Sequence, residues 1–143
     1  MVWQLWSMKE AAYKLYTQIN PSRFYNPKGF ECEIRDKRGF VTFKTFRCYV
    51  ETKVTPDYII SEARLETVPM TSKVIKFKNC KAELQSIAIR NQTLKFITKN
   101  LSKPSDKIRI RSSVFNIPRL KINSKIIPIS LTHHGNYGAF AIA

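Results

Sequence analysis

Two stretches of this sequence carry residue types that could do chemistry, and the first lies near the N-terminus. It reads WSMKEAAYK over residues 6–14, with Glu10 placed between Lys9 and Lys14. On a helix Glu10 and Lys14 lie one turn apart, so both can address one ligand. A carboxylate can hold Mg²⁺, and amines can neutralise phosphate oxygens that the metal does not reach. The alternative is an ordinary Glu–Lys pair on a solvated helix face.

The second stretch reads SLTHHGNYGAF over residues 130–140. It follows an apolar run, contains a turn signal at Gly135-Asn136, and precedes another apolar run. Thr132 and His133 can hydrogen-bond a phosphate or a ribose, and functional residues often lie in such loops. The alternative is a polar hairpin turn with two solvated histidines.

The periodicity of apolar residues predicts two helices that position these stretches. Residues 3–18 form the first, with an apolar stripe opposite the side that carries Trp6, Glu10 and Lys14. Residues 81–101 form the second. The first stripe consists of Leu5, Met8, Ala12 and Leu15, and the second of Leu84, Ile87, Ala88, Leu94, Ile97 and Leu101.

The rest of the chain is rich in strand signals separated by Pro, Gly, Asn and Asp. We expect an α+β fold with a largely antiparallel sheet packed with two main helices. The segment 40–54 is expected to form one long strand or half of a hairpin. The expected strands are 30–35, 40–54, 57–65, 73–77, 107–114, 126–132 and 137–142.

Length and composition indicate a single globular domain of 143 residues with a strong positive charge. Lys and Arg number 25 against 10 Asp and Glu, a net charge of +15, and +9 of it falls in the last 60 residues. Such a charge favours a phosphate-bearing or carboxylate-rich partner. The sequence has no apolar run long enough for a membrane helix and no secretory signal. Three cysteines without a CxxC pair favour a reduced, cytoplasmic protein.

Taken together, the two stretches resemble a known family. WSMKEAAYK resembles the WSxKEAxxK signature helix of the 4′-phosphopantetheinyl transferase superfamily. SLTHHGNYGAF resembles the SxSHxxxYxxA stretch that closes its holo-acyl-carrier-protein synthase type. NIPRL, residues 116–120, is similar to the GxPxL segment that precedes that closing stretch. The three segments occur in the family's order, and the resemblance covers the two ends of the chain better than residues 30–105.

The resemblance implies a transferase that moves 4′-phosphopantetheine from coenzyme A to a serine of an apo acyl or peptidyl carrier protein. The by-product is adenosine 3′,5′-bisphosphate. It implies that Glu10 is a catalytic Mg²⁺ ligand and that Lys14 contacts the diphosphate and helps to deprotonate or orient the serine. It also implies that Lys9, Thr132 and His133 contact coenzyme A. The carrier proteins of this family are acidic, so a basic face would dock them.

The sequence departs from the family at its N-terminus. Family members open with a strand that carries a G-x-D motif, whose Asp is a second Mg²⁺ ligand, and nothing like it precedes Trp3. We therefore expect an N-terminally truncated domain of this fold, with Asp36 and Asp57 as candidate substitutes for the missing Asp. Thr132 replaces a Ser that the family often has. The oligomeric state and the identity of the carrier protein stay open, a homo-oligomer being one alternative.

Two other functions compete with the transferase. The first is a basic nucleic-acid-binding module, in which aromatic side chains stack bases on a sheet face. The second is an inactive transferase fragment that still binds the nucleotide. The motif match favours a transferase over the nucleic-acid-binding module, and turnover distinguishes the active enzyme from the inactive fragment. The aromatic residues in question are Tyr25, Phe40, Phe43, Phe46 and Tyr49.

Overall fold

The structure is a computed structural model that describes residues 1–22, 26–65, 69–78 and 81–143. The chain divides into two compact units, Met1–Val68 and Pro69–Ala143, each with its own hydrophobic core. The polypeptide builds two cores, one around each of its two long helices.

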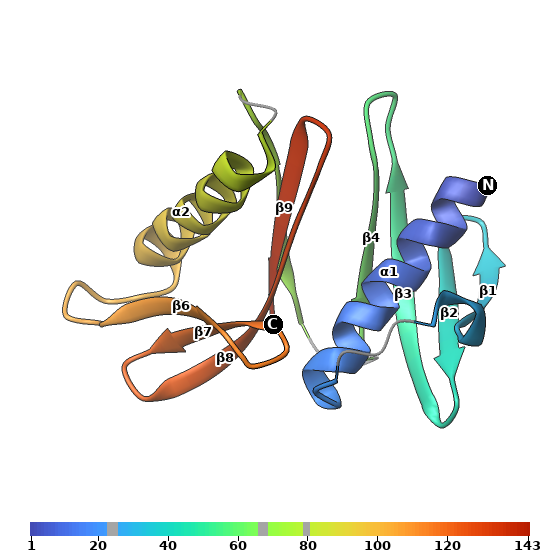
Figure 1. Ribbon diagram of the computed structural model, residues 1–143, viewed down its shortest axis with the longest axis horizontal. Helices are drawn as coiled ribbons and strands as arrows, with labels where there is room; N and C mark the ends of the chain where they lie inside the picture. Colours follow the sequence, from blue (N-terminus) through green and yellow to red (C-terminus); the bar gives the residue numbers. More distant parts are fainter. Residues whose placement is uncertain (23–25, 66–68, 79–80) are drawn as a thin grey trace. The chain divides into compact units, whose positions relative to one another are not determined.

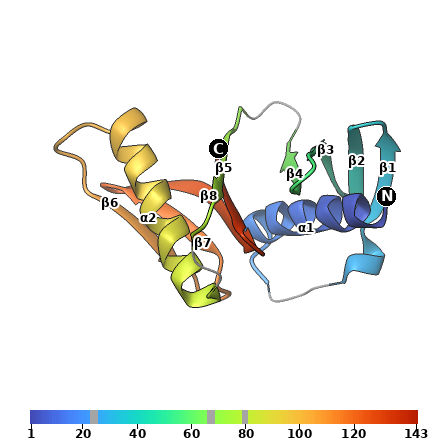
Figure 2. The same ribbon diagram turned by 90° about the horizontal axis from the view of Figure 1, so that it is seen from above.

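Unit 1 consists of one long helix, a 3₁₀ turn and a four-stranded antiparallel sheet. Figures 1 and 2 show α1 lying along one face of this sheet. The strands follow one another in chain order, β1-β2-β3-β4, as expected for a meander. The elements are α1 (Val2–Ile19), η1 (Pro27–Gly29), β1 (Glu31–Arg35), β2 (Arg38–Phe43), β3 (Phe46–Val54) and β4 (Ile59–Arg64).

The core of unit 1 is formed by the predicted apolar stripe of α1. Met8 and Ala12 are fully buried, and they pack against alternate residues of β2 and β3, such as Val41 and Val50. The rings of Phe30 and Phe43 stack with their centroids 4.6 Å apart, which closes the end of the core next to η1. Burial of this apolar surface holds α1 on the sheet and fixes which side of the helix stays open.

Unit 2 consists of a five-stranded antiparallel sheet, in the order β5-β9-β8-β7-β6, and one helix that covers one of its faces. Its core contains fully buried aliphatic and aromatic side chains from α2, β7, β8 and β9. The elements are β5 (Thr71–Lys76), α2 (Ala82–Asn100), β6 (Ile108–Ser112), β7 (Pro118–Ile122), β8 (Lys125–His134) and β9 (Tyr137–Ile142).

The buried side of α2 differs from the predicted stripe. The buried residues are Gln85, Ile89, Thr93 and Ile97, each four positions after the last. Of the predicted stripe, Leu84, Ile87 and Leu101 are exposed. Two of the buried side chains are polar, and both are hydrogen-bonded. Gln85 Nε2 donates to the Gly135 carbonyl at 2.7 Å, and Thr93 Oγ1 donates to the Ile89 carbonyl at 2.6 Å.

The α+β class with mainly antiparallel strands is confirmed, one strand prediction is wrong, and one strand was not predicted. Residues 40–54 belong to the hairpin β2–β3, because Lys44, at a φ of 52°, reverses the chain at Lys44-Thr45. Residues 118–122, for which no strand was expected, form β7 between β6 and β8. None of the described helices is long and apolar enough to cross a membrane.

Candidate functional site

The first group of predicted site residues lies on α1. Glu10 and Lys14 are both half-buried and lie away from the fully buried positions Met8 and Ala12. Lys9 is directed to another partner, since its Nζ donates to the Pro27 carbonyl at 2.9 Å and ties α1 to η1. Glu10 and Lys14 are thus brought together by the helix, and Lys9 is held at the side of the helix that faces η1.

Lys14 has an environment that differs from that of a solvated lysine. Burial lowers the pKa of its ammonium group, and the nearby carboxylate of Glu10 opposes that shift by raising it. An ordinary exposed Glu–Lys pair has no desolvation of this kind. Its partial burial therefore distinguishes Lys14 from a lysine on a fully solvated helix face. Perturbed lysines of this type are suited to proton transfer and phosphate contact.

Glu10 is the one predicted metal ligand, so its surroundings test whether Mg²⁺ fits. Within the described residues, no three His, Cys, Asp or Glu side chains come together as a ligand group. Mg²⁺ is commonly held by one or two carboxylates, with substrate phosphates and water completing the octahedron. Glu10 beside a lysine fits that pattern as one carboxylate ligand to a metal bound with a diphosphate. Asp36 and Asp57 lie in the turns β1–β2 and β3–β4 and are exposed.

The second group lies on β8, and its two members point to opposite sides. Thr132 pairs with Ala139 and His133 with Gly138 in the regular register of β8 and β9. Neighbouring residues of a strand project from opposite faces of the sheet. His133 shares the face of Leu131 and Phe140, which is the side of the sheet that α2 covers, and Thr132 projects from the other face. A ligand on one face therefore reaches one of the two side chains.

The turn after β8 is held more firmly than a solvated hairpin. Gly135 adopts a φ of 56°, which favours glycine, and its carbonyl accepts the hydrogen bond from Gln85 on α2. The backbone N–H of Phe77 donates to the Asn136 carbonyl at 2.7 Å, which ties the turn to the end of β5. Both contacts fix the end of β8 that carries Thr132 and His133.

The predicted site residues are divided between the two units. Lys9, Glu10 and Lys14 belong to unit 1, and Thr132 and His133 belong to unit 2. Each group is built on a regular element, a helix in one case and a strand in the other, and so each has a defined local geometry.

The aromatic residues of the nucleic-acid alternative do not form one platform. Phe43 is buried in the core of unit 1 and Phe46 packs against it. Phe40 and Tyr49 lie opposite each other on the sheet face away from α1, and the guanidinium carbon of Arg47 lies 4.2 Å from the Phe40 ring centroid. That face also carries acidic residues such as Glu51. The remaining aromatic residue, Tyr25, lies outside the described residues.

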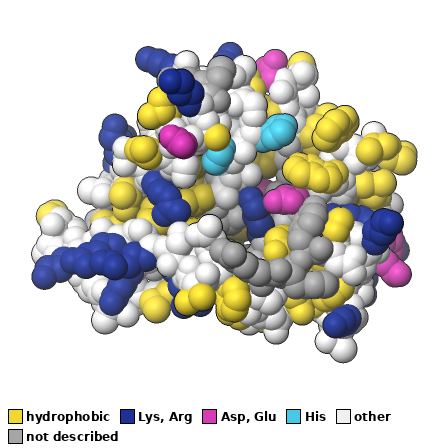
Figure 3. Space-filling view, in the orientation of Figure 1, with side chains coloured by type: hydrophobic (Ala, Val, Ile, Leu, Met, Phe, Trp, Pro, Cys, Tyr) yellow, Lys and Arg dark blue, Asp and Glu magenta, His cyan; other side chains and the backbone are white. Residues whose placement is uncertain are grey.

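The structure also shows a group of cations that the sequence pattern alone did not single out. Arg109 and Arg111 on β6 lie opposite Lys121 and Arg119 on β7, and all four side chains are exposed. We call these four residues the basic face. They project away from α2, because the alternate residues of both strands belong to the core. Figure 3 shows Lys and Arg side chains gathered over the region where Figure 1 draws β6 and β7. The alternating patterns IRIRS and PRLKI were the signal for it.

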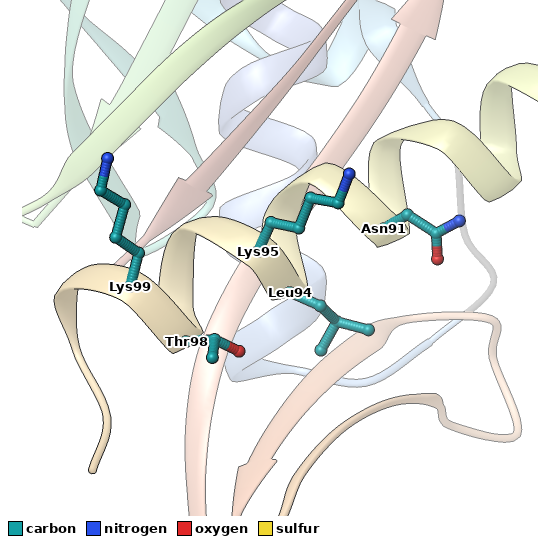
Figure 4. Close-up of a pocket in the computed structure, with 5 residues that line it drawn as sticks. All are labelled: Asn91, Leu94, Lys95, Thr98 and Lys99. Carbon is teal, nitrogen blue, oxygen red and sulfur yellow. The ribbon is translucent and has the colours of Figure 1, made fainter. Parts of the chain in front are cut away.

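Among the described residues, a shallow hollow also lies on the surface of α2, and it does not form a ligand-binding site. Its lining comes from this one helix, and the side chains of Lys95 and Lys99 extend from it in Figure 4. A site that encloses a small ligand needs walls from several elements. The lining residues are Asn91, Leu94, Lys95, Thr98 and Lys99.

Comparison with known proteins gives no relative for this chain. No family model matches it, and no curated protein or solved structure matches it either.

Proposed function

We propose that this chain has a 4′-phosphopantetheinyl transferase-like fold and transfers 4′-phosphopantetheine from coenzyme A to a serine of an apo acyl or peptidyl carrier protein. The observation that carries the proposal is the pair Glu10 and Lys14. They lie one turn apart on α1, inside the stretch that resembles the family's signature helix, and burial lowers the pKa of Lys14. A carboxylate beside a desolvated lysine is a chemically competent site for a diphosphate.

In the proposed reaction, the serine oxygen attacks the phosphorus on the pantetheine side of the diphosphate. A new P–O bond forms, the bond from that phosphorus to the bridging oxygen breaks, and adenosine 3′,5′-bisphosphate leaves with the electron pair. Lys14 contacts the diphosphate and takes the hydroxyl proton or orients the serine, a role that its lowered pKa favours. Mg²⁺, when bound, offsets the charge of the diphosphate, and Glu10 supplies one of its oxygen ligands.

The remaining site residues act in binding. Lys9 already donates to a carbonyl, and its ammonium has further N–H groups for a phosphate oxygen. On unit 2, Thr132 and His133 are candidates for a contact to a nucleotide, and a nucleotide on one face of β8 reaches one of them.

The test compares turnover of the intact chain with that of Glu10→Ala, using an apo acyl carrier protein, coenzyme A and Mg²⁺. Glu31→Ala is the matched control, because it removes an exposed carboxylate from β1 of the same unit. We expect Glu10→Ala to lose at least about 100-fold in turnover, as for a group that positions a metal, and the control to keep its activity. Nucleotide binding without turnover by the intact chain would favour the inactive-fragment alternative. Equal turnover of all three proteins would remove Glu10 from the mechanism.

A further inference from the structure

The basic face is an ordered array of cations on a regular sheet. Its two cross-strand pairs are Arg109 with Lys121 and Arg111 with Arg119. Residues opposite each other in an antiparallel sheet have Cβ atoms about 5 Å apart, and same-face neighbours along a strand are about 7 Å apart. The four cations therefore stand at the corners of a patch of about 5 by 7 Å at the level of the backbone.

The described residues of unit 2 leave this array without a countercharge. Unit 2 contains fourteen Lys and Arg residues against two acidic residues, Glu83 and Asp106, and so carries +12 of the net charge of +15. In the part of the chain that the structure describes, none of the four side chains forms an ion pair. Like charges directly opposite each other across two strands repel, so the array lowers the stability of the free protein. A ligand that brings negative charge to this face removes the repulsion on binding.

The density of positive charge favours a phosphate backbone over a protein surface. The centre of a protein–protein interface is depleted of charged residues, whereas a nucleic-acid interface is much more positively charged. Here four cations form the centre, and the aliphatic residues, Ile126 and Pro128 of β8, lie at its margin. Arginine also matches the geometry of a phosphate through two parallel N–H···O bonds.

A second group of residues lies on the same face, at the other end of β8. Alternate residues of a strand share a face, so His134 lies on the face of Ile126 and Pro128. His134 lies opposite Tyr137 of β9, and Tyr137 lies opposite Lys76 of β5. His134 and Lys76 are exposed, and the Nζ atom of Lys76 lies 6.0 Å from the centroid of the Tyr137 ring. Rings exposed on a sheet face are a common stacking platform for the bases of single-stranded nucleic acids.

Hydroxyl side chains connect the two groups. Ser130 and Thr132 lie on this face of β8, between Pro128 and His134. Hydroxyls, like Arg and Lys, contact the phosphate and sugar oxygens of nucleic acids. The path from Pro128 to His134 along β8 is about 20 Å, because each residue of a strand rises about 3.4 Å. Successive phosphates of one nucleic-acid strand are about 3.4 Å apart along a helix axis, so about six nucleotides span this path.

We propose that this face of unit 2 binds a single-stranded nucleic acid, with phosphates held by the basic face and a base stacked on His134. Both kinds of contact are independent of the base sequence. A duplex keeps its bases paired and stacked, so it offers none to His134. Binding at this face uses neither Glu10 nor Lys14, which belong to unit 1, so it is independent of the proposed transfer.

The test measures binding of a fluorescent oligouridine of about 12 nucleotides, long enough to span the face, by anisotropy over a series of salt concentrations. The intact chain is compared with Arg111→Glu/Arg119→Glu and with Lys95→Glu/Lys99→Glu. Both double variants change the net charge equally, and the second places the change on α2, on the other side of the sheet. At about 0.15 M salt, where the Debye length is about 8 Å, we expect the first variant to weaken binding about tenfold or more and the second less than about threefold.

The dependence of binding on salt counts the phosphate contacts. Four contacts on a single strand predict that log Kd rises by about 3 per unit of log salt concentration, and the loss of two contacts lowers this slope by about 1.4. Arg109→Gln/Lys121→Gln removes the other cross-strand pair and should lower the slope by the same amount. Lys95→Glu/Lys99→Glu should keep the slope of the intact chain.

The contribution of His134 is measured separately. His134→Ala should weaken oligouridine binding about fivefold or more, because a stacked base is lost. His133→Ala is the matched control, since it changes the neighbouring side chain on the opposite face, and it should leave oligouridine binding in place. Inorganic polyphosphate, which has phosphates and no bases, should bind the intact chain and His134→Ala equally.

Several outcomes would contradict the proposed site. Absence of oligouridine binding, or equal affinity and slope for the intact chain and Arg111→Glu/Arg119→Glu, would overturn it. Unchanged oligouridine binding by His134→Ala would overturn the base contact and assign the face to a phosphate chain alone. Tighter binding of a duplex of the same length would contradict a single-stranded ligand. Vesicles that contain phosphatidylserine, bound through Arg111 and Arg119 while the oligouridine is not, would assign the face to an anionic lipid surface instead.

Discussion

Glu10 and Lys14 lie one turn apart on α1, and the carboxylate of Glu10 raises the pKa that burial lowers at Lys14. The two effects act on one ammonium group from opposite directions. Burial is the larger of them, so the pKa stays below its ordinary value. This balance makes the charge of Lys14 sensitive to the charge of its neighbour.

Replacing Glu10 with Gln should lower the pKa of Lys14 further. The substitution keeps the shape of the side chain and removes the negative charge that favours the ammonium. The pH titration of Lys14, followed by NMR of its Cε–H groups, should shift to lower pH relative to the intact chain. Glu31→Gln on β1 is the control and should leave the titration in place. An unchanged titration in Glu10→Gln would contradict the electrostatic coupling.

Replacing Lys14 with Met should increase the stability of the protein at neutral pH. At pH values below the folded-state pKa, Lys14 is charged in both states, and the cost of burying its charge is fully present. Between the folded-state pKa and the ordinary pKa of Lys14, the unfolded chain binds more protons at this residue than the folded chain does. The free energy of unfolding therefore increases as the pH rises through this range. Lys14→Met should lack this increase with pH.

Chemical denaturation at a series of pH values measures that effect as the difference between the intact chain and Lys14→Met. Lys53→Met, at an exposed position of β3, is the matched control and should show a constant difference from the intact chain. The advantage of Lys14→Met over the intact chain should shrink as the pH rises. An advantage that grows with rising pH would mean that burial does not lower the pKa of Lys14.

Thr132 and His133 should not contribute equally to coenzyme A binding. They project from opposite faces of β8, so a nucleotide bound on one face contacts one of them. Among Thr132→Val and His133→Ala, we expect one to weaken coenzyme A binding about tenfold, as for a lost hydrogen bond to a charged group, and the other to stay within about twofold. Calorimetric titration with coenzyme A checks this. Large losses in both variants would mean that both side chains reach the ligand.

Arg111→Glu should stabilise the protein. The substitution converts a repulsive cross-strand pair with Arg119 into an attractive one. The free energy of unfolding should rise by about 0.5 kcal/mol at low salt, and the gain should shrink as salt is added. Lys95→Glu on α2 serves as the control, since it makes the same change of charge without a cross-strand partner. A loss of stability in Arg111→Glu would contradict the repulsion assigned to the basic face.

The sequence predicted α1 and its orientation because several signals agree there. Met8 and Ala12 recur at helical spacing, they are apolar, and they are the residues that the structure buries. The same reasoning placed Glu10 and Lys14 together on another side of the helix. For α2 it failed, because Gln85 and Thr93 are polar and yet are buried through hydrogen bonds. A search for apolar residues at helical spacing misses polar residues that are buried with a hydrogen-bond partner far away in the chain. Gln85, which donates to the Gly135 carbonyl, is such a residue.

The strands show a second limit of sequence reasoning. No strand was predicted at β7 because Pro118, a strand-breaking residue, opens a run of only five residues, and its pairing with β6 and β8 is what identifies it. Thr132 and His133 were assigned to one ligand because they are adjacent and precede a turn. The structure extends β8 through His134, so their side chains alternate. Two adjacent side chains project from opposite faces only if both residues lie within the strand. The local sequence does not define the residue at which the strand ends.

Intact-mass spectrometry of the carrier protein would show whether this chain transfers phosphopantetheine. An apo acyl carrier protein is incubated with this chain, coenzyme A and Mg²⁺, and then digested to locate any added group. We expect a mass gain of one phosphopantetheine on a serine, dependent on Mg²⁺ and absent with Glu10→Ala. No gain with the intact chain, under conditions where a known transferase modifies the same carrier protein, would refute the proposed transfer.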